Sequence, residues 1–329
     1  MAETIGQEAV AEELVKFPED TDSRDWLWAK KILYELNQPR VWSNICIAAF
    51  NKTDNPVLKI WFLLEHVNGW RRQIGKWDMQ VAFEALDEIK RRIDRLPDDH
   101  PRKGRLFGLW LYHSAWGIYH PTGEFAKAAE CHETAVERAE ASGEKREESL
   151  SLYNAAYEWL NEAILLNKGI GERYGEFTKS ACEFLDYLAA LILEGAPSDN
   201  DVRWRANVLR HLAFYGWVVE GRYLGRPDVS FLYELPEALE PAFADAEVAL
   251  RALCELSRYP GRAVEITSQI SPAADPDWGS FAILVRISAM EKMGKTEEAQ
   301  AAREELDEFF KDKHGGHVAK AILDYGLLK

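Results

Sequence analysis

The stretch that most constrains the fold runs from Leu106 to Ser142 and has the pattern of two helices joined by a short turn. Residues 120–123 (His-Pro-Thr-Gly) interrupt it, and proline with glycine is typical of a turn. Apolar residues recur at helical spacing on both sides, namely Trp110, Tyr112, Ala115, Ile118 and Tyr119, then Phe125, Ala128, Ala129, Ala135 and Val136. The stretch predicts an antiparallel helix pair.

Such a pair cannot bury both of its faces alone, so further pairs are expected on either side of it. Other segments show the same helical periodicity, and none shows the alternation typical of strands. We therefore predict an all-α fold of stacked antiparallel helix pairs. The other predicted helices are 1–16, 24–36, 40–50, 57–72, 77–96, 147–166, 172–193, 199–221, 242–256, 260–270, 278–293, 296–310 and 317–328.

The composition is that of a folded, soluble protein. Of 329 residues, 47% are hydrophobic and 29% charged, and the tryptophans extend from Trp26 to Trp278, so the core should extend along most of the chain. The sequence lacks an apolar run of ~18 residues, so no membrane partner is expected. The four cysteines are far apart and match no zinc or disulfide pattern, which favours a reducing compartment and a cytoplasmic location.

The net charge of −15 makes nucleic acid an unlikely partner for the surface as a whole, because phosphate would be repelled. One local exception is 71–105, with ten Lys or Arg against seven Asp or Glu. Its ordinary interpretation is a solvated helix face, and RNA binding there ranks last. Acidic segments at 1–25 and 234–255 favour a basic partner.

Three parts are expected along the chain. Residues 1–221 form an N-terminal stack of helix pairs, and 242–329 form C-terminal pairs with a closing helix. Between them, 222–241 is irregular and contains glycine and proline. It can be a linker, a hinge or a lid, and the whole chain can also be one continuous solenoid. The sequence does not define the oligomeric state.

The turn and its flanks resemble the tetratricopeptide repeat. Gly123, Phe125, Ala128 and Ala135 match its turn glycine, its aromatic and its two small packing positions, with Tyr112 and Tyr119 at first-helix aromatic positions. Weaker matches are Gly175, Phe177, Ser180 and Phe184, then Gly294 with Ala299, and Gly75 with Trp77. The repeat period is 34 residues, whereas Gly75, Gly123 and Gly175 are separated by 48 and 52. The resemblance is to a degenerate form, and it implies a right-handed superhelix.

The resemblance also implies that the first helix of each pair lines a concave groove. Asn154 stands where peptide-binding members often carry asparagine, but His113 and Gly117 replace the basic clamp of members that bind a terminal carboxylate. Aromatic and amide side chains suit the walls and backbone contacts of a peptide site. The predicted partner-binding residues are Trp110, His113, Tyr153, Asn154, Tyr157, Asn207, Arg210 and Phe214. The alternative interpretation of Tyr153 and Tyr157 is core packing.

No residue pattern predicts catalysis, a cofactor or a metal. His113 and His120 lie on one helix face roughly 10 Å apart, too far to share a metal ion, and His132 could approach them only through the fold. Asp98-Asp99 lies between two prolines and indicates a loop rather than a magnesium site. Phosphate-loop, nucleophile-elbow and zinc-protease motifs are not found.

Two functions remain open. The first is a non-catalytic scaffold or adaptor whose groove binds a protein or peptide segment. The second is a helical enzyme or a small-molecule or peptide sensor whose pocket is closed by 222–241, with Trp217, Tyr223, Phe231 and Tyr233 as candidate lining residues. Converging polar side chains in an enclosed site would favour the second, and an open trough would favour the first.

Overall fold

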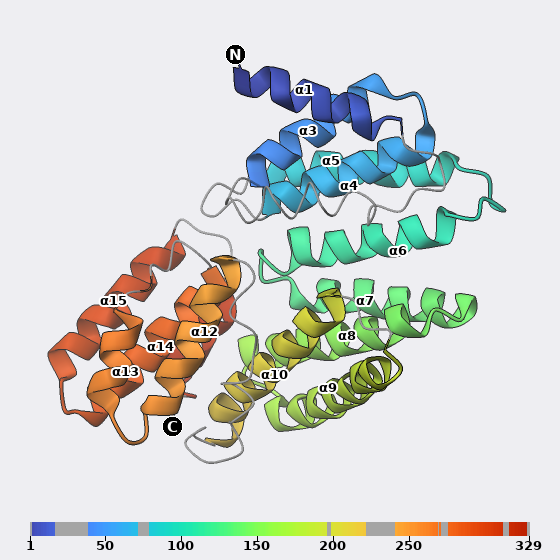
Figure 1. Ribbon diagram of the computed structural model, residues 1–329. Coiled ribbons are helices and arrows are strands. Elements are labelled where there is room, and N and C mark those ends of the chain that lie inside the picture. Colours follow the sequence, from blue (N-terminus) through green and yellow to red (C-terminus); the bar gives the residue numbers. More distant parts are fainter. Residues whose placement is uncertain are drawn as a thin grey trace.

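The computed structural model describes residues 2–16, 39–71, 79–195, 199–221, 241–268, 270, 276–311 and 316–327. Every regular element within these ranges is a helix, which confirms the all-α prediction (Figure 1). Helices that are neighbours in the sequence pack against each other. Each of the described helices is too short or too polar to span a bilayer.

The first group of helices lies at the N-terminal end and surrounds α4, which is apolar around most of its circumference. Asn55 caps α4, because its Oδ1 accepts hydrogen bonds from the backbone of Val57 and Leu58 at 2.9 and 3.1 Å. Ile60 and Phe62 are fully buried. The group comprises α1 (Ala2–Leu14), α3 (Pro39–Lys52), α4 (Pro56–Arg71), α5 (Met79–Arg95) and α6 (Lys103–Ser114), which continues into the π-helical turn η2 (Ala115–Tyr119).

The second group contains the remaining helices and shares one apolar core from Phe125 to Ile322. In Figure 1, α7 to α10 lie beneath α6, and α12 to α15 lie to their left. The helices are α7 (Phe125–Ser142), α8 (Lys145–Leu165), α9 (Ile170–Leu193), α10 (Asp199–Glu220), α12 (Pro241–Glu255), α13 (Pro260–Thr267), α14 (Pro276–Lys292), α15 (Thr296–Lys311) and α16 (His317–Asp324).

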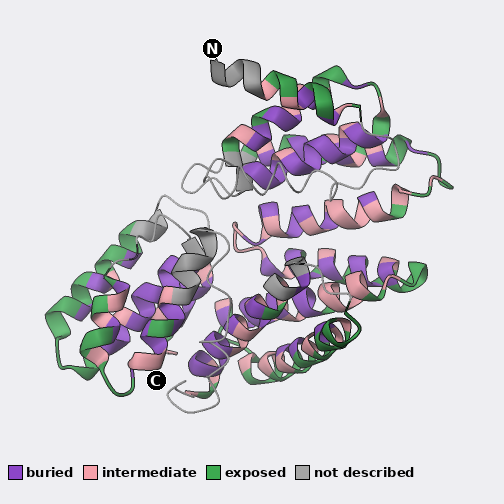
Figure 2. Ribbon diagram, in the orientation of Figure 1, coloured by how far each residue is buried: buried purple, intermediate pink, exposed green. Residues whose placement is uncertain are grey.

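The apolar core divides at the turn that follows η2. One cluster of buried residues runs from Ala11 to Ile118, and the other runs from Phe125 to Ile322. Figure 2 shows buried residues concentrated on the facing sides of the helices in both groups. The predicted division at 222–241 falls almost entirely on residues 222–240, outside the described part, and stays a prediction. Helices from both sides of that segment share the second core.

Two of the expected turn glycines lie in turns. Gly123 and Gly294 have φ of +74° and +72°, in the left-handed region that glycine adopts without steric cost. The family-like spacing placed Gly175 at a turn, and that match is wrong, because Gly175 lies inside α9 as the predicted helix 172–193 has it, and the preceding turn uses Gly169. Helical periodicity runs through Gly175, and a single glycine does not end a helix. Gly75 lies outside the described residues.

The predicted helix 106–119 does not stay α-helical to its end. From Ala115 onward it widens into η2, where the backbone N–H of His120 bonds to the carbonyl of Ala115, five residues back, at 2.8 Å. A second bond of this spacing joins Glu124 to Tyr119, also at 2.8 Å. π-Helical turns insert a residue into a helix and are frequent at functional sites. Here the turn carries Trp116 and leads directly to His120.

Candidate functional site

Most of the predicted groove residues lie in the interior. Trp110 and Asn207 are half-buried, whereas the other six are buried: His113, Tyr153, Asn154, Tyr157, Arg210 and Phe214. The faces of α8 and α10 that were expected to line an open groove are covered by other helices in this structure. Binding by these residues therefore stays a prediction, and any site that they form is enclosed.

Trp110 belongs to the N-terminal group. Its indole Nε1 donates to the carbonyl of Leu86 on α5 at 3.0 Å, and its ring stacks on Phe107 with centroids 5.4 Å apart. The ammonium of Lys90 lies 5.6 Å from the ring centroid. These contacts fix Trp110 against α5, away from the predicted residues of α8 and α10.

The tyrosines of α8 meet α10 at His211. The hydroxyl of Tyr153 lies 2.5 Å from Nδ1 of His211, and the ring of Tyr157 stacks on the same imidazole at 4.5 Å. Burial raises the pKa of Tyr153 well above its usual value, and the nearby Tyr157 and Glu158 add to the shift. Tyr153 therefore stays protonated, and its hydroxyl joins the two helices.

The predicted residues of α10 contact each other and α14. A guanidinium nitrogen of Arg210 donates to Oδ1 of Asn207 at 3.4 Å. Phe214 stacks on Phe281 of α14 at 3.7 Å, and His211 stacks on Trp278 of the same helix at 5.7 Å. The side of α10 expected to face a ligand is thus covered by the chain's own C-terminal helices.

A polar network that the sequence did not indicate lies beside these rings. Nδ1 of His120 donates to the carboxylate of Glu158, at 2.9 and 3.0 Å from its two oxygens, and Glu158 is completely buried. Asn161 donates from Nδ2 to the same carboxylate at 3.3 Å, and its Oδ1 accepts a hydrogen bond from Tyr215. The hydroxyl of Tyr215 fixes the orientation of the Asn161 amide. Every bond at Glu158 suits an ionised carboxylate.

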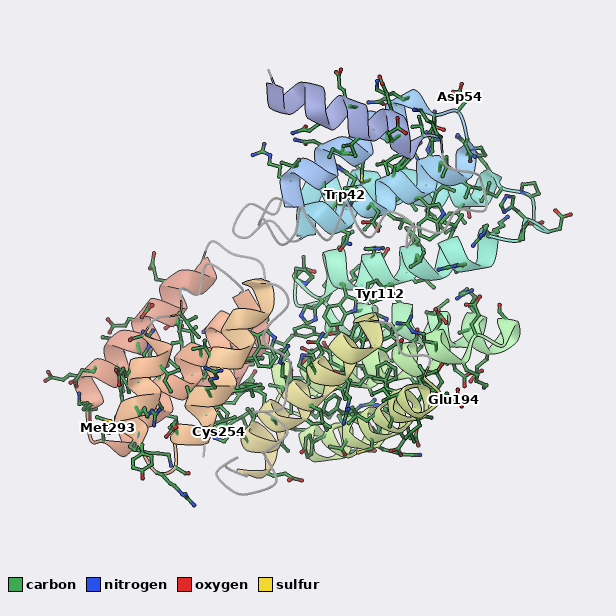
Figure 3. The ribbon with its side chains drawn as sticks, viewed as in Figure 1. Trp42, Asp54, Tyr112, Glu194, Cys254 and Met293 are labelled. Atoms are coloured by element: carbon green, nitrogen blue, oxygen red, sulfur yellow. The ribbon has the colours of Figure 1, made fainter. Side chains whose placement is uncertain are left out.

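His132, on α7, lies next to this network and is electrically neutral. Burial lowers its pKa from 6.5 to about 3, and the nearby imidazole of His120 adds to the shift. Its ring lies 6.1 Å from Trp116 and 6.2 Å from Tyr112, centroid to centroid. Figure 3 labels Tyr112, which lies near the middle of the molecule beneath the α6 ribbon. The ring of His132 thus extends from α7 and packs against α6 and η2.

Asn154 lies one helical turn before Glu158 on the same face of α8. It is 1% exposed, and neither its amide nitrogen nor its amide oxygen has a hydrogen-bond partner. A buried polar group without a partner costs about 1–3 kcal/mol. The indole nitrogen of Trp116 and Nε2 of His132 are buried without a partner as well. Three side chains from three elements therefore carry unused hydrogen-bonding groups.

The register of the helices places these three side chains at the same height along the helix axes. The chain reverses after η2 and again after α7, so α8 runs in the same direction as α6 and η2. Trp116 precedes His120 by four residues, as Asn154 precedes Glu158, and His120 contacts Glu158. Trp116 also stacks on Tyr157 at 5.8 Å. We call Trp116, His132 and Asn154 the inner layer, which lies one turn from the His120–Glu158 contact.

One pattern in the sequence points to this site, but periodicity alone does not show that its residues are buried. Asn154, Glu158 and Asn161 are spaced i, i+4 and i+7, so they form a polar stripe along α8. A polar stripe beside an apolar one is normally the solvated face of a helix. Here the polar stripe is buried instead, because α8 is covered on both faces. The covering contacts come from α10 and α16, which are distant from α8 in the sequence.

The described residues include no group of three or more His, Cys, Asp or Glu side chains placed to hold a metal ion. The four cysteines, all within the described residues, form no disulfide bond. Burial raises the pKa of Cys131 and of Cys254 to about 11, so both are protonated near neutral pH. The inner layer itself offers groups for hydrogen bonding: the Asn154 amide, the indole N–H of Trp116 and Nε2 of His132.

Comparisons of the chain with protein-family models, with curated proteins and with solved structures give no significant match. Its function is therefore argued from the site.

Proposed function

We propose that the protein is a non-catalytic interaction protein. It binds a peptide segment on the face of α8 that carries Asn154. In this proposal the helices form a degenerate tetratricopeptide-like solenoid, a right-handed stack of antiparallel pairs, that acts as a scaffold or adaptor. The observation that carries the proposal is Asn154, whose buried amide has no partner on either atom. An amide side chain offers one acceptor and two donors, which is what a peptide backbone group requires.

The rings around Asn154 supply the apolar walls of such a site. Tyr153 and Tyr157 lie on either side of it in the sequence, and both contact His211 of α10. Flat aromatic side chains lose little conformational entropy on binding and are common anchors at interfaces. The net charge of −15 favours fast association with a basic partner.

Affinity capture from native lysate tests this function. Wild-type protein and the variant Asn154→Leu are used as bait, and retained proteins are identified by mass spectrometry. We expect a partner that wild-type protein retains and that Asn154→Leu loses by at least about tenfold, the equivalent of ~1.4 kcal/mol, without a lower melting temperature. A partner retained equally by both baits would show that Asn154 does not anchor it.

Phe184→Ala is the structural control. Phe184 is buried in the core of the second group of helices and is not among the predicted binding residues, so its truncation should lower the melting temperature together with any binding. The contrast with Asn154→Leu separates loss of a binding group from loss of the fold.

A second candidate function is a sensor of a small molecule. The enclosure of the inner layer favours it, because all three unpartnered groups lie inside the fold rather than along an open trough. The segment proposed as its lid, 222–241, falls almost wholly outside the described residues. A cytoplasmic location belongs to either function as a proposal, and four cysteines that form no disulfide bond support it.

A further inference from the structure

We infer that the inner layer, formed by Trp116, His132 and Asn154, binds a single uncharged amide group. This inference rests on the proposed function, because it names the chemical group by which a peptide would be held. A small molecule that carries a carboxamide would present the same group.

The unpartnered atoms complement an amide. The indole Nε1 of Trp116 can only donate, and the Asn154 amide provides both donors and an acceptor. A ligand carbonyl can therefore accept from Trp116 or from Nδ2 of Asn154, while a ligand N–H donates to Oδ1 of Asn154. Nε2 of His132 can accept a second N–H in one tautomer. A hydroxyl or an ether would leave more of these groups without a partner.

The charges of the site favour a neutral ligand. The carboxylate of Glu158 already accepts hydrogen bonds from His120 and Asn161. It therefore does not need a charged ligand as a partner. His132 is neutral near pH 7 because burial lowers its pKa to about 3. An anion or a cation in the layer would face no opposite charge, and burying an unpaired ion is far more costly than burying a bonded amide.

The rings of the site favour a planar group. Trp116 stacks on Tyr157 at 5.8 Å with an angle of 28° between the rings, and it also contacts His120 at 4.7 Å. Tyr112 lies edge-on to His132 at 6.2 Å. A flat amide can lie along such ring faces while its edge makes hydrogen bonds, as amide groups do in aromatic-lined peptide sites.

The test follows the indole N–H of Trp116 by NMR in the full-length protein labelled with ¹⁵N at the tryptophan side chains. Trp116→Phe assigns the signal. The probes are acetamide, acetate and N-acetylglycine methylamide. Acetamide and acetate have the same shape and differ in charge, whereas the third probe carries peptide groups. We expect acetamide or the blocked peptide to shift the signal saturably, on the order of millimolar for probes this small. Acetate should leave it unmoved at equal concentration.

Asn154→Leu should weaken the amide-induced shift at least about tenfold while the other indole signals stay in place, which shows that the variant is folded. A shift by the blocked peptide supports both proposals. A shift by acetamide alone supports the amide site and contradicts the peptide-binding function. The inference is overturned if no amide moves the signal, if acetate moves it equally, or if Asn154→Leu responds as wild type does.

Discussion

Nδ1 of His120 lies 2.9 Å from Oε1 and 3.0 Å from Oε2 of Glu158, a contact across 38 positions of sequence. His120 begins the turn between the two apolar cores, and Glu158 lies in the second of them. A second contact holds the same turn, because Nε2 of His317 donates to the carbonyl of Pro121 at 3.0 Å. These two polar contacts fix the turn, in addition to the packing of α6 and η2 against α7.

Glu158→Gln should destabilise the protein by about 3 kcal/mol. Removing one partner of a buried charged pair costs about 3–5 kcal/mol, and the new amide can still accept from His120. Its nitrogen, however, would face Nδ2 of Asn161, so two donors would meet where the carboxylate accepted both bonds. Urea unfolding followed by circular dichroism measures the loss.

Glu162→Gln is the control for this prediction. Glu162 lies one turn later on α8 and is half-buried, so the change should alter stability by less than about 0.5 kcal/mol. Equal losses in the two variants would contradict a special role for Glu158.

Asn154→Leu should raise the free energy of unfolding by about 1 kcal/mol, because it replaces an unpartnered buried amide by an apolar side chain of similar size. Asn161→Leu should lower it by about 2 kcal/mol, since Asn161 bonds to Glu158 and to Tyr215. Both residues are buried on one face of α8, so each serves as the control for the other. The measurement is the urea midpoint at pH 7. A loss of similar size in both variants would show that Asn154 is a structural residue.

His132 should make wild-type stability fall as the pH drops below 6.5. Its folded pKa of about 3 lies below the unfolded value of 6.5, so between these values the unfolded chain binds a proton that the folded chain does not. Stability is then lost by up to about 1.4 kcal/mol per pH unit from 6.5 down toward 3. His132→Phe should show a shallower decline over this range by that amount. Urea midpoints at pH 7, 6, 5 and 4 give both slopes, and parallel curves would mean that the pKa of His132 is the same in the folded and the unfolded chain.

Helical periodicity and turn residues were sufficient to predict the class of fold. Gly123 and Gly294 were expected at turns and lie there, because left-handed backbone is readily adopted only by glycine. Gly175 was assigned to a turn on a family-like spacing, yet the apolar stripe through Phe177, Ala181 and Phe184 keeps α9 continuous across it. Local signals identify turns well only where the apolar periodicity also breaks.

The candidate site was much less predictable than the fold. Asn154 and Tyr157 were identified as binding residues from a resemblance, but both are buried, and Tyr157 packs on His211, which lies on α10 more than fifty residues later. Glu158 was missed because a glutamate on a helix is normally solvated. Its partner His120 follows a π-helical turn. The sequence contains no pattern that predicts the change from α-helical to π-helical hydrogen bonding there.

Gly123→Ala should destabilise the protein more than Gly294→Ala does. Both glycines have left-handed backbone, so each substitution introduces a strain of about 1–2 kcal/mol. A Cβ at position 123 would also lie 3.0 Å from the imidazole of His317, whereas nothing lies within 4 Å of one at 294. The difference in thermal unfolding between the two variants reports this contact.

His317→Ala provides the test of that explanation in a double-mutant cycle. In its background the imidazole is absent, so Gly123→Ala should cost no more than Gly294→Ala does in the wild type. His317→Ala alone should be destabilising as well, by about 1 kcal/mol, because it removes the hydrogen bond to Pro121. If Gly123→Ala costs as much in this background as in the wild type, backbone strain alone accounts for its effect.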